Sequence, residues 1–257
     1  MEEKEVLELA LQAGHILLEN GAEIFRVEET MERICRHYGV RSDSEFILSN
    51  GIFLTAGDGR EQFFAKVQHI PVSGTHLDRV AAINQLSREI EAGKYTVREA
   101  AEELERIKVL PGKRKWMLIL ASGIGSGAFC CLFGGNVRDT AAAFLAGLLL
   151  YTYVLCFSSV HMSKIVGNIT GGAIVTLFCG LLYAARVGTH LNYMIIGSIM
   201  PLIPGVPFTN AIREVADGDY ISGAVRMLDA LLTFFCIAIG VGFGVSVLNF
   251  FVGGAML

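Results

Sequence analysis

The chain has 257 residues, of which 53% are hydrophobic, and its formal net charge is −4. A negative chain without a basic stripe of interleaved aromatic residues is not typical of a nucleic-acid-binding protein. Charge is also unevenly spread, because the part from Trp116 onward has only these charged residues: Arg138, Asp139, Lys164, Arg186, Arg213, Glu214, Asp217, Asp219, Arg226 and Asp229. That composition is typical of a membrane domain, whereas the preceding part suits a small soluble domain. We therefore predict a soluble domain over residues 1–114 and a membrane domain over 115–257.

The N-terminus, M-E-E-K-E-V-L-E, is acidic and has no apolar segment of the signal-peptide type. We therefore expect no cleaved signal peptide and a cytoplasmic first domain. Of the six cysteines only Cys35 lies outside the apolar stretches, and no pair has the spacing of zinc ligands. The sequence thus predicts no disulfide framework, no bound metal and no cofactor.

The first domain is predicted to be α+β. Its expected elements are helices over 6–18, 22–38, 77–92 and 97–107 and strands over 44–49, 52–56 and 62–70. Asn20-Gly21 ends the first helix, and the turn signals Asn50-Gly51 and 57–59 favour an antiparallel meander. Thr96, with Glu99 three residues later, predicts a capping box at the last helix.

The polar residues of this domain do not form a recognisable catalytic motif. His15, Glu23, Glu28 and His69 are titratable, but the sequence lacks a nucleophile elbow, a P-loop and a paired metal motif. We interpret the glutamates between 23 and 32 as a solvated helix face. A membrane-anchored hydrolase and a receptor or assembly platform stay open as alternatives.

The second domain begins at a cationic and aromatic boundary, Lys113 to Trp116. Five membrane spans are predicted, over about 116–136, 140–160, 165–185, 191–209 and 220–248. With the first domain inside, six cationic residues fall at cytoplasmic junctions and two, Arg138 and Arg186, fall outside, which agrees with the positive-inside rule. The C-terminus is therefore expected outside. Pairs of glycines four residues apart, such as Gly123 and Gly127 or Gly240 and Gly244, predict close helix packing.

Three prolines, Pro201, Pro204 and Pro207, interrupt the fourth span. Since each removes a backbone donor, a regular helix cannot pass through all three. Transporters use such broken helices, whose amide ends face the substrate. Either Thr209 or Asn210 is expected to cap a new short helix after the break. The alternative is a proline-rich loop between two spans.

Two further polar sets lie in the predicted membrane domain. Asn168 and Thr170 fall early in the third span. On the last helix Ser222, Arg226, Asp229 and Thr233 share one face by their spacing. Because an intramembrane aspartate is costly, we predict that Asp229 carries the coupling proton, with a merely structural Arg226–Asp229 pair as the alternative.

The chain resembles the threonine/serine exporter (ThrE) family in two stretches. These are G-A-E-I-F-R-V-E-E-T-M at 21–31 and P-G-V-P-F-T-N-A-I-R-E-V-A-D-G-D-Y-I-S-G-A-V-R at 204–226. The family motif falls on Glu23, Arg26 and Glu28 in the first stretch, and in the second on Pro204, Gly205, Pro207, Thr209, Asn210, Arg213, Asp217, Gly218, Asp219, Ser222, Gly223 and Arg226. The order of a soluble domain followed by five spans matches over essentially the whole chain.

The resemblance implies a secondary exporter of small carboxylates in the bacterial inner membrane. Full-length members resemble this chain joined to a second membrane half, so the resemblance implies a smaller multi-span partner of the YjjB type and a higher oligomer. The fused form implies threonine and serine as substrates, and the split form implies succinate. We expect the substrate carboxylate near Pro204, Gly205, Pro207, Thr209 and Asn210, and a second carboxylate at Arg213 or Arg226.

Overall fold

The computed structural model describes residues 2–40, 44–57, 62–70, 76–157 and 163–252. It divides into two compact units. The N-terminal unit comprises Met1–Gly112 together with Val206–Met227, and the membrane unit comprises Lys113–Gly205 and Leu228–Leu257. The segment with the strongest family resemblance therefore belongs to the same compact unit as the first domain.

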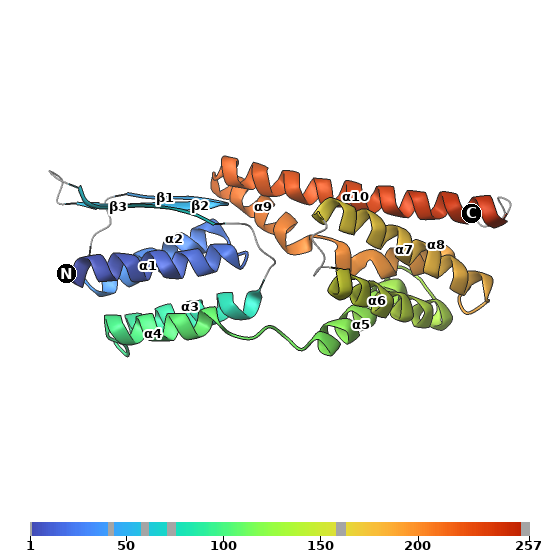
Figure 1. Cartoon of the computed structure of the whole chain (residues 1–257), viewed down its shortest axis with the longest axis horizontal. Coiled ribbons are helices and arrows are strands. Elements are labelled where there is room, and N and C mark those ends of the chain that lie inside the picture. The colour runs from blue at the N-terminus through green and yellow to red at the C-terminus, as the bar shows by residue number, and fades with distance from the viewer. Residues whose placement is uncertain (1, 41–43, 58–61, 71–75, 158–162, 253–257) are drawn as a thin grey trace. The chain divides into compact units, whose positions relative to one another are not determined.

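The N-terminal unit is built in three layers (Figure 1), with a sheet on one side of α1 and α2 and a second helix pair on the other. The helices of its first 112 residues are α1 (Glu2–Glu19), α2 (Ile24–His37), α3 (Leu77–Glu91) and α4 (Val97–Lys108). The middle layer is the most buried because both of its faces are covered. Leu7, Leu17, Ile24 and Met31 are completely shielded from solvent there. All four helices were predicted, α1 and α2 from their apolar spacing.

The sheet is an antiparallel meander in the order β1-β2-β3, as predicted. Its strands are β1 (Ser44–Leu48), β2 (Gly51–Gly57) and β3 (Gln62–His69). Ile52 and Leu54 are buried, whereas Phe46 and Phe53, which are register partners, are exposed. This alternation is that of a sheet with one covered face. The turn predicted at 57–59 lies mostly outside the described residues.

Helix α4 starts with the predicted capping box. The Thr96 hydroxyl accepts a hydrogen bond from the Glu99 backbone N–H, and the Glu99 carboxylate accepts one from the Thr96 backbone N–H at 2.8 Å. The Thr96 N–H and hydroxyl hold the pKa of Glu99 below its usual value. The sequence signal was specific because both partners of a capping box lie within one helical turn.

The membrane unit contains α5 (Lys115–Leu132), α6 (Val137–Phe157), α7 (Lys164–Ala184), α8 (Leu191–Ile199), the 3₁₀ turn η1 (Met200–Leu202) and most of α10 (Tyr220–Val252). In the described part of the chain, four helices are long and apolar enough to cross a membrane. A fifth span is present if the pair formed by α8–η1 and α9 (Gly205–Asp217) is counted as one. The predicted fold class, an α+β domain followed by membrane helices with a proline-broken span, is confirmed.

The proline break differs from its prediction in one detail. The chain bends by 66° between Leu202 and Gly205, but α9 starts at Gly205 rather than after Asn210. Pro207 can lie in the first turn of a helix, where its missing N–H has no intrahelical partner to lose. Thr209 and Asn210 therefore lie within α9, and neither caps it.

Helices of the membrane unit approach closely at glycines. A Cβ on Gly240 of α10 would lie 2.1 Å from the Ile169 carbonyl oxygen of α7, and one on Gly197 would lie 2.7 Å from backbone atoms of α5. The predicted pair Gly240 and Gly244 thus packs on α7. Gly123 and Gly127 pack on α6 in the same way, whereas a Cβ on Gly167 would meet nothing within 4 Å.

We expect Gly240→Ala to lower the melting temperature of the purified protein in detergent. Its methyl group would overlap a backbone carbonyl, and overpacking of this kind costs about 1–3 kcal/mol. Gly242→Ala is the matched control, since a Cβ there meets nothing within 4 Å. Equal melting temperatures for the two variants would contradict the close contact between α7 and α10.

Candidate functional site

The candidate site is built around a helical hairpin formed by α9 and the start of α10. Gly218 has a φ of 98° and ends α9, and the Asp219 N–H then donates to the Glu214 carbonyl at 2.9 Å. A Cβ on Gly223 would lie 2.9 Å from the backbone nitrogen of Val215, so the two helices are in close contact at this point. The two motif glycines, Gly218 and Gly223, are therefore required by the hairpin itself.

The turn between α1 and α2 presents its carbonyl groups to this hairpin. Gly21 has a φ of 83°, as expected for a left-handed residue after a helix end. The Gly21 carbonyl accepts a hydrogen bond from Asn210 Nδ2 at 3.1 Å, and the Ala22 carbonyl accepts one from Arg226 Nη2 at 3.0 Å. Side chains about 190 to 200 residues away in sequence thus satisfy two successive backbone acceptors.

Glu23, the residue before α2, joins two arginines. Arg26 Nε donates to one carboxylate oxygen at 2.6 Å, and Arg213 of α9 donates to the other. Glu23 is only 8% exposed, whereas the side chains of both arginines are nearly half exposed. A buried carboxylate with a guanidinium group at each oxygen is the arrangement expected for a stable ion-pair network.

A second ion pair lies beside the first. Arg226 Nη1 is 3.2 Å from Glu214 Oε1, and both side chains are largely buried. Glu214 also has the Ile24 N–H nearby and interacts electrostatically with Glu23. Neither of its oxygens makes a hydrogen bond of good geometry within the described part of the chain. We call Glu23, Arg26, Arg213, Glu214 and Arg226 the Arg–Glu cluster.

The Arg–Glu cluster has chemistry suited to anionic ligands. Three guanidinium groups face two carboxylates, so its formal charge is +1. Arg213 and Arg226 each hold a carboxylate supplied by the chain itself, and a ligand carboxylate has the same geometry and charge. The cluster can therefore exchange an internal carboxylate for an external one.

The remaining predicted site residues lie at several places. Ser222 is buried and accepts a hydrogen bond from the Ser49 N–H at 3.2 Å. Thr209 and Asp217 are exposed on α9, Glu28 is half-buried on α2, and Asn168 is half-buried near the start of α7. Pro204, Gly205 and Pro207 flank the bend, and Asp219 lies between α9 and α10. Ser222 thus ties the hairpin to the first domain.

Asp229 does not pair with Arg226. Lys164, at the start of α7, lies 2.6 Å from Asp229 Oδ2, and both side chains are about half exposed. Arg226 instead pairs with Glu214. The alternative in which Arg226 and Asp229 form a structural pair is therefore wrong. The role of Asp229 in proton coupling stays a prediction.

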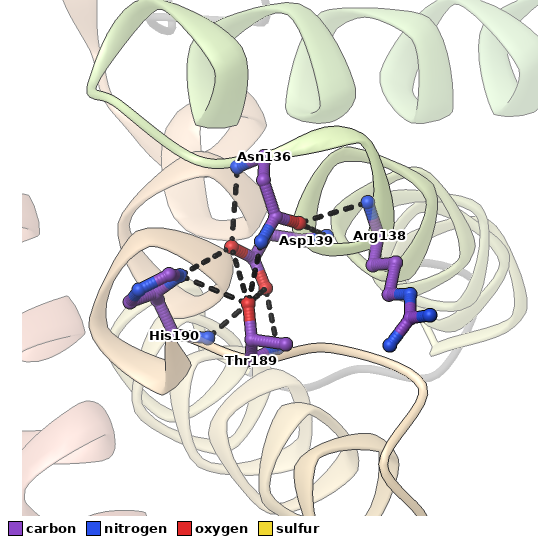
Figure 2. Close-up of polar contacts among 5 residues, drawn as sticks. All are labelled: Asn136, Arg138, Asp139, Thr189 and His190. Atoms are coloured by element: carbon purple, nitrogen blue, oxygen red, sulfur yellow. Dashed lines mark hydrogen bonds and ion pairs between the residues drawn. The ribbon is translucent and has the colours of Figure 1, made fainter.

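A second polar cluster lies in the membrane unit, where the loop before α8 meets the start of α6 (Figure 2). Asn136 and Asp139 cap α6 reciprocally: Asn136 Oδ1 accepts from the Asp139 N–H at 3.0 Å, and Asp139 accepts from the Asn136 N–H at 3.2 Å. The same carboxylate accepts hydrogen bonds from the Thr189 and His190 N–H groups at 2.6 and 3.0 Å. His190 Nδ1 lies 2.8 Å away. Asp139 is completely buried and holds two distant segments together.

Sequence reasoning missed Glu214, Asp139 and Lys164. Asp139 had a usable signal, because Asn136 and Asp139 have the spacing of a capping box. Glu214 and Lys164 had none, since their partners are distant in sequence and ion pairing follows no local period. Among the described residues, no three His, Cys, Asp or Glu side chains are grouped to hold a metal ion.

Comparison with known proteins adds independent information. The model of a family described as "Putative threonine/serine exporter" (ThrE) matches residues 8–248. The proteins named "Probable succinate transporter subunit YjjP" from Klebsiella aerogenes and Escherichia coli are 26% and 25% identical, and each alignment covers 93% of both chains. A "Pheromone-regulated membrane protein 10" from Debaryomyces hansenii is 22% identical over 88% of this chain and 23% of its own length. No solved structure matches.

We expect Asp139→Asn to destabilise the membrane unit. An amide nitrogen cannot accept hydrogen bonds, so at least one N–H of the Figure 2 cluster loses its partner, and a hydrogen bond to a charged group contributes about 1.5–3 kcal/mol. Thermal melting in detergent measures the effect, and Arg138→Gln, an exposed neighbour, is the control. If Asp139→Asn melts at the same temperature as the control, these hydrogen bonds do not stabilise the unit.

Proposed function

Since this chain belongs to the threonine/serine exporter (ThrE) family, we propose that it is one subunit of a proton-coupled secondary exporter of small carboxylate metabolites. Two relatives aligned over nearly their whole length are named succinate transporter subunits, and the family description names threonine and serine. All three substrates carry at least one carboxylate. Their common group is thus the one that the Arg–Glu cluster can bind.

The observation that carries this proposal is that the motif residues Asn210, Arg213 and Arg226 converge with Glu23 in the N-terminal unit. Arg213 and Arg226 come from α9 and α10, and both are bound to acceptors of the first domain. A substrate that replaces Glu23 on Arg213 would loosen this attachment. Substrate binding would then be linked to movement of the hairpin.

Pro204, Gly205 and Pro207 support the proposal as the pivot of the hairpin. The bend ends at Gly205, and a Cβ on this glycine would meet nothing within 4 Å. Gly205 is therefore not required for close packing, and we propose that its role is to make the backbone flexible at the bend. We keep Thr209 as a residue that contacts substrate because it is exposed on the same helix.

A partner subunit follows from the names of the relatives, which describe a transporter subunit rather than a whole transporter. We propose a smaller multi-span membrane protein of the YjjB type as that partner, within a higher oligomer. The chain itself is then the larger, non-enzymatic subunit of an inner-membrane complex.

We propose a cytoplasmic domain over residues 1–114 and a membrane domain over 115–257, of which residues 206–227 belong to the same compact unit as the first domain. Residues 206–227 pack with the first domain, so the turn between α9 and α10 lies on the same side of the membrane as that domain. This requires an even number of crossings between Lys115 and Gly218. Helices α5, α6 and α7 supply three, and we assign the fourth to the bent pair of α8–η1 with α9. The rest of α10 then crosses once more.

We expect a reporter fused after Leu257 to be active only outside the cytoplasm. The segment of α10 from Leu228 to Val252 is about 37 Å long at 1.5 Å per residue, which is enough to cross the hydrocarbon core. A paired fusion after Gly112, before the first span, is the cytoplasmic control. Activity of the C-terminal reporter in the cytoplasm would contradict the fifth crossing.

We expect Arg213→Gln and Arg226→Gln each to reduce carboxylate export about 10- to 100-fold. A hydrogen bond to a charged group contributes about 1.5–3 kcal/mol, and 1.4 kcal/mol is tenfold. The measurement is release of labelled succinate, threonine and serine from cells that express this chain with its partner subunit. Arg98→Gln, exposed on α4, is the control, and membrane abundance is measured for every variant.

Wild-type export by both arginine variants would contradict a role for the Arg–Glu cluster in binding substrate. Full export by the chain alone in liposomes would contradict the partner. If no carboxylate is released above the vector control in the presence of the partner, the proposed function itself is wrong.

A further inference from the structure

Glu214 differs from every other carboxylate described in this protein by its combination of burial and sparse pairing. It is 2% exposed, its two oxygens make no hydrogen bond of good geometry, and its one cationic contact is Arg226 Nη1 at 3.2 Å. The other charged groups that act on it, Glu23 and Asp219, have the same sign as Glu214. The ionised form of Glu214 therefore depends mainly on a single guanidinium group, with the Ile24 N–H as the other nearby favourable group.

The charge of Glu214 therefore depends on which carboxylate is bound to Arg226. When it loses its only cation, the buried Glu214 carboxylate has no solvent contact and only the nearby Ile24 N–H to stabilise its charge. Protonation restores neutrality and costs less than an unpaired buried charge. Asp229 is in a different position, because Lys164 Nζ donates a hydrogen bond to its carboxylate at 2.6 Å and neither side chain is buried within the protein.

We propose that Glu214 takes up one proton when a substrate carboxylate replaces it on Arg226, so that a dicarboxylate and a proton bind this exporter together. The exchange balances. Before it, Glu214 is paired with Arg226, and a substrate carboxylate and a proton are free. After it, the substrate carboxylate is paired with Arg226, and Glu214 carries the proton and is neutral. No bond other than that to the proton is made or broken. The inference rests on the proposed export of carboxylates and names the proton site within it.

The charges of the Arg–Glu cluster favour a dicarboxylate as the substrate. Arg213 and Arg226 provide two guanidinium positions that are already occupied by carboxylates. Binding of a dianion would change the formal charge of the Arg–Glu cluster from +1 to −1, and one proton on Glu214 would bring that charge to zero. A zwitterionic amino acid has an ammonium group that can pair with the released carboxylate, which removes the need for the proton. Transport of a dianion would thus carry the proton outward with the substrate.

The test is a count of protons taken up on binding. Calorimetric titration of the complex of this chain and its partner in nanodiscs, with succinate as ligand, is run in buffers of different ionisation enthalpy between about pH 6.5 and 8. A dicarboxylic acid is ionised throughout this range. We expect uptake of about one proton per succinate, and an affinity that rises by up to tenfold for each pH unit lowered. Glu214→Gln should still bind succinate, with no proton uptake and no dependence on pH.

The controls separate this site from its surroundings. Glu102→Gln removes an exposed carboxylate of the same unit and should behave as wild type. Glu214→Asp keeps a titrating group and should keep the proton uptake. The wild-type measurement needs no variant: succinate binding without proton uptake overturns the inference even if Glu214→Gln fails to fold.

Two further outcomes overturn the inference while the exporter function stands. One is proton uptake that persists in Glu214→Gln but disappears in Asp229→Asn, which assigns the proton to Asp229. The other is binding of L-threonine or L-serine without binding of succinate, which would show that the substrate is not a dicarboxylate. Absence of export of all three carboxylates is a failure of the proposed function instead.

Discussion

The attachment of α9 and α10 to the turn between α1 and α2 is the interaction on which the rest of the N-terminal unit depends. Gly21 follows the end of α1 in a left-handed conformation, and the carbonyls of Gly21 and Ala22 and the side chain of Glu23 all face α9 and α10. Asn210, Arg213 and Arg226 satisfy these acceptors. Both stretches of family resemblance are therefore the two sides of one contact.

Two features of the sequence follow from this contact. Helix α10 is longer than a membrane crossing requires, because its first two turns belong to the N-terminal unit rather than to the membrane unit. The proline break also follows from the packing of α9 on the first domain. A chain that leaves α8 and must then pack α9 on the first domain has to change direction, and Pro204 with Gly205 allows the 66° bend.

Local patterns predicted the elements well, and long-range pairing could not be predicted. Apolar spacing predicted α1 and α2, turn residues predicted the meander, and Thr96 with Glu99 predicted the cap of α4. Each of these signals lies within a few residues of the sequence. Glu23 was interpreted as part of a solvated helix face, yet its partner Arg213 is 190 positions away. Side-chain charge shows that a partner is needed but not which residue supplies it.

The contrast between Asp139 and Glu214 shows why burial alone does not identify a titrating group. Both carboxylates are almost entirely shielded from solvent. Asp139 accepts three backbone N–H groups and contacts His190 Nδ1, so its charge is held by donors that are fixed in the fold. Glu214 relies on one guanidinium group that a ligand carboxylate can compete for. The first arrangement fixes a protonation state, whereas the second lets ligand binding change it, and coupling between substrate and proton needs the second.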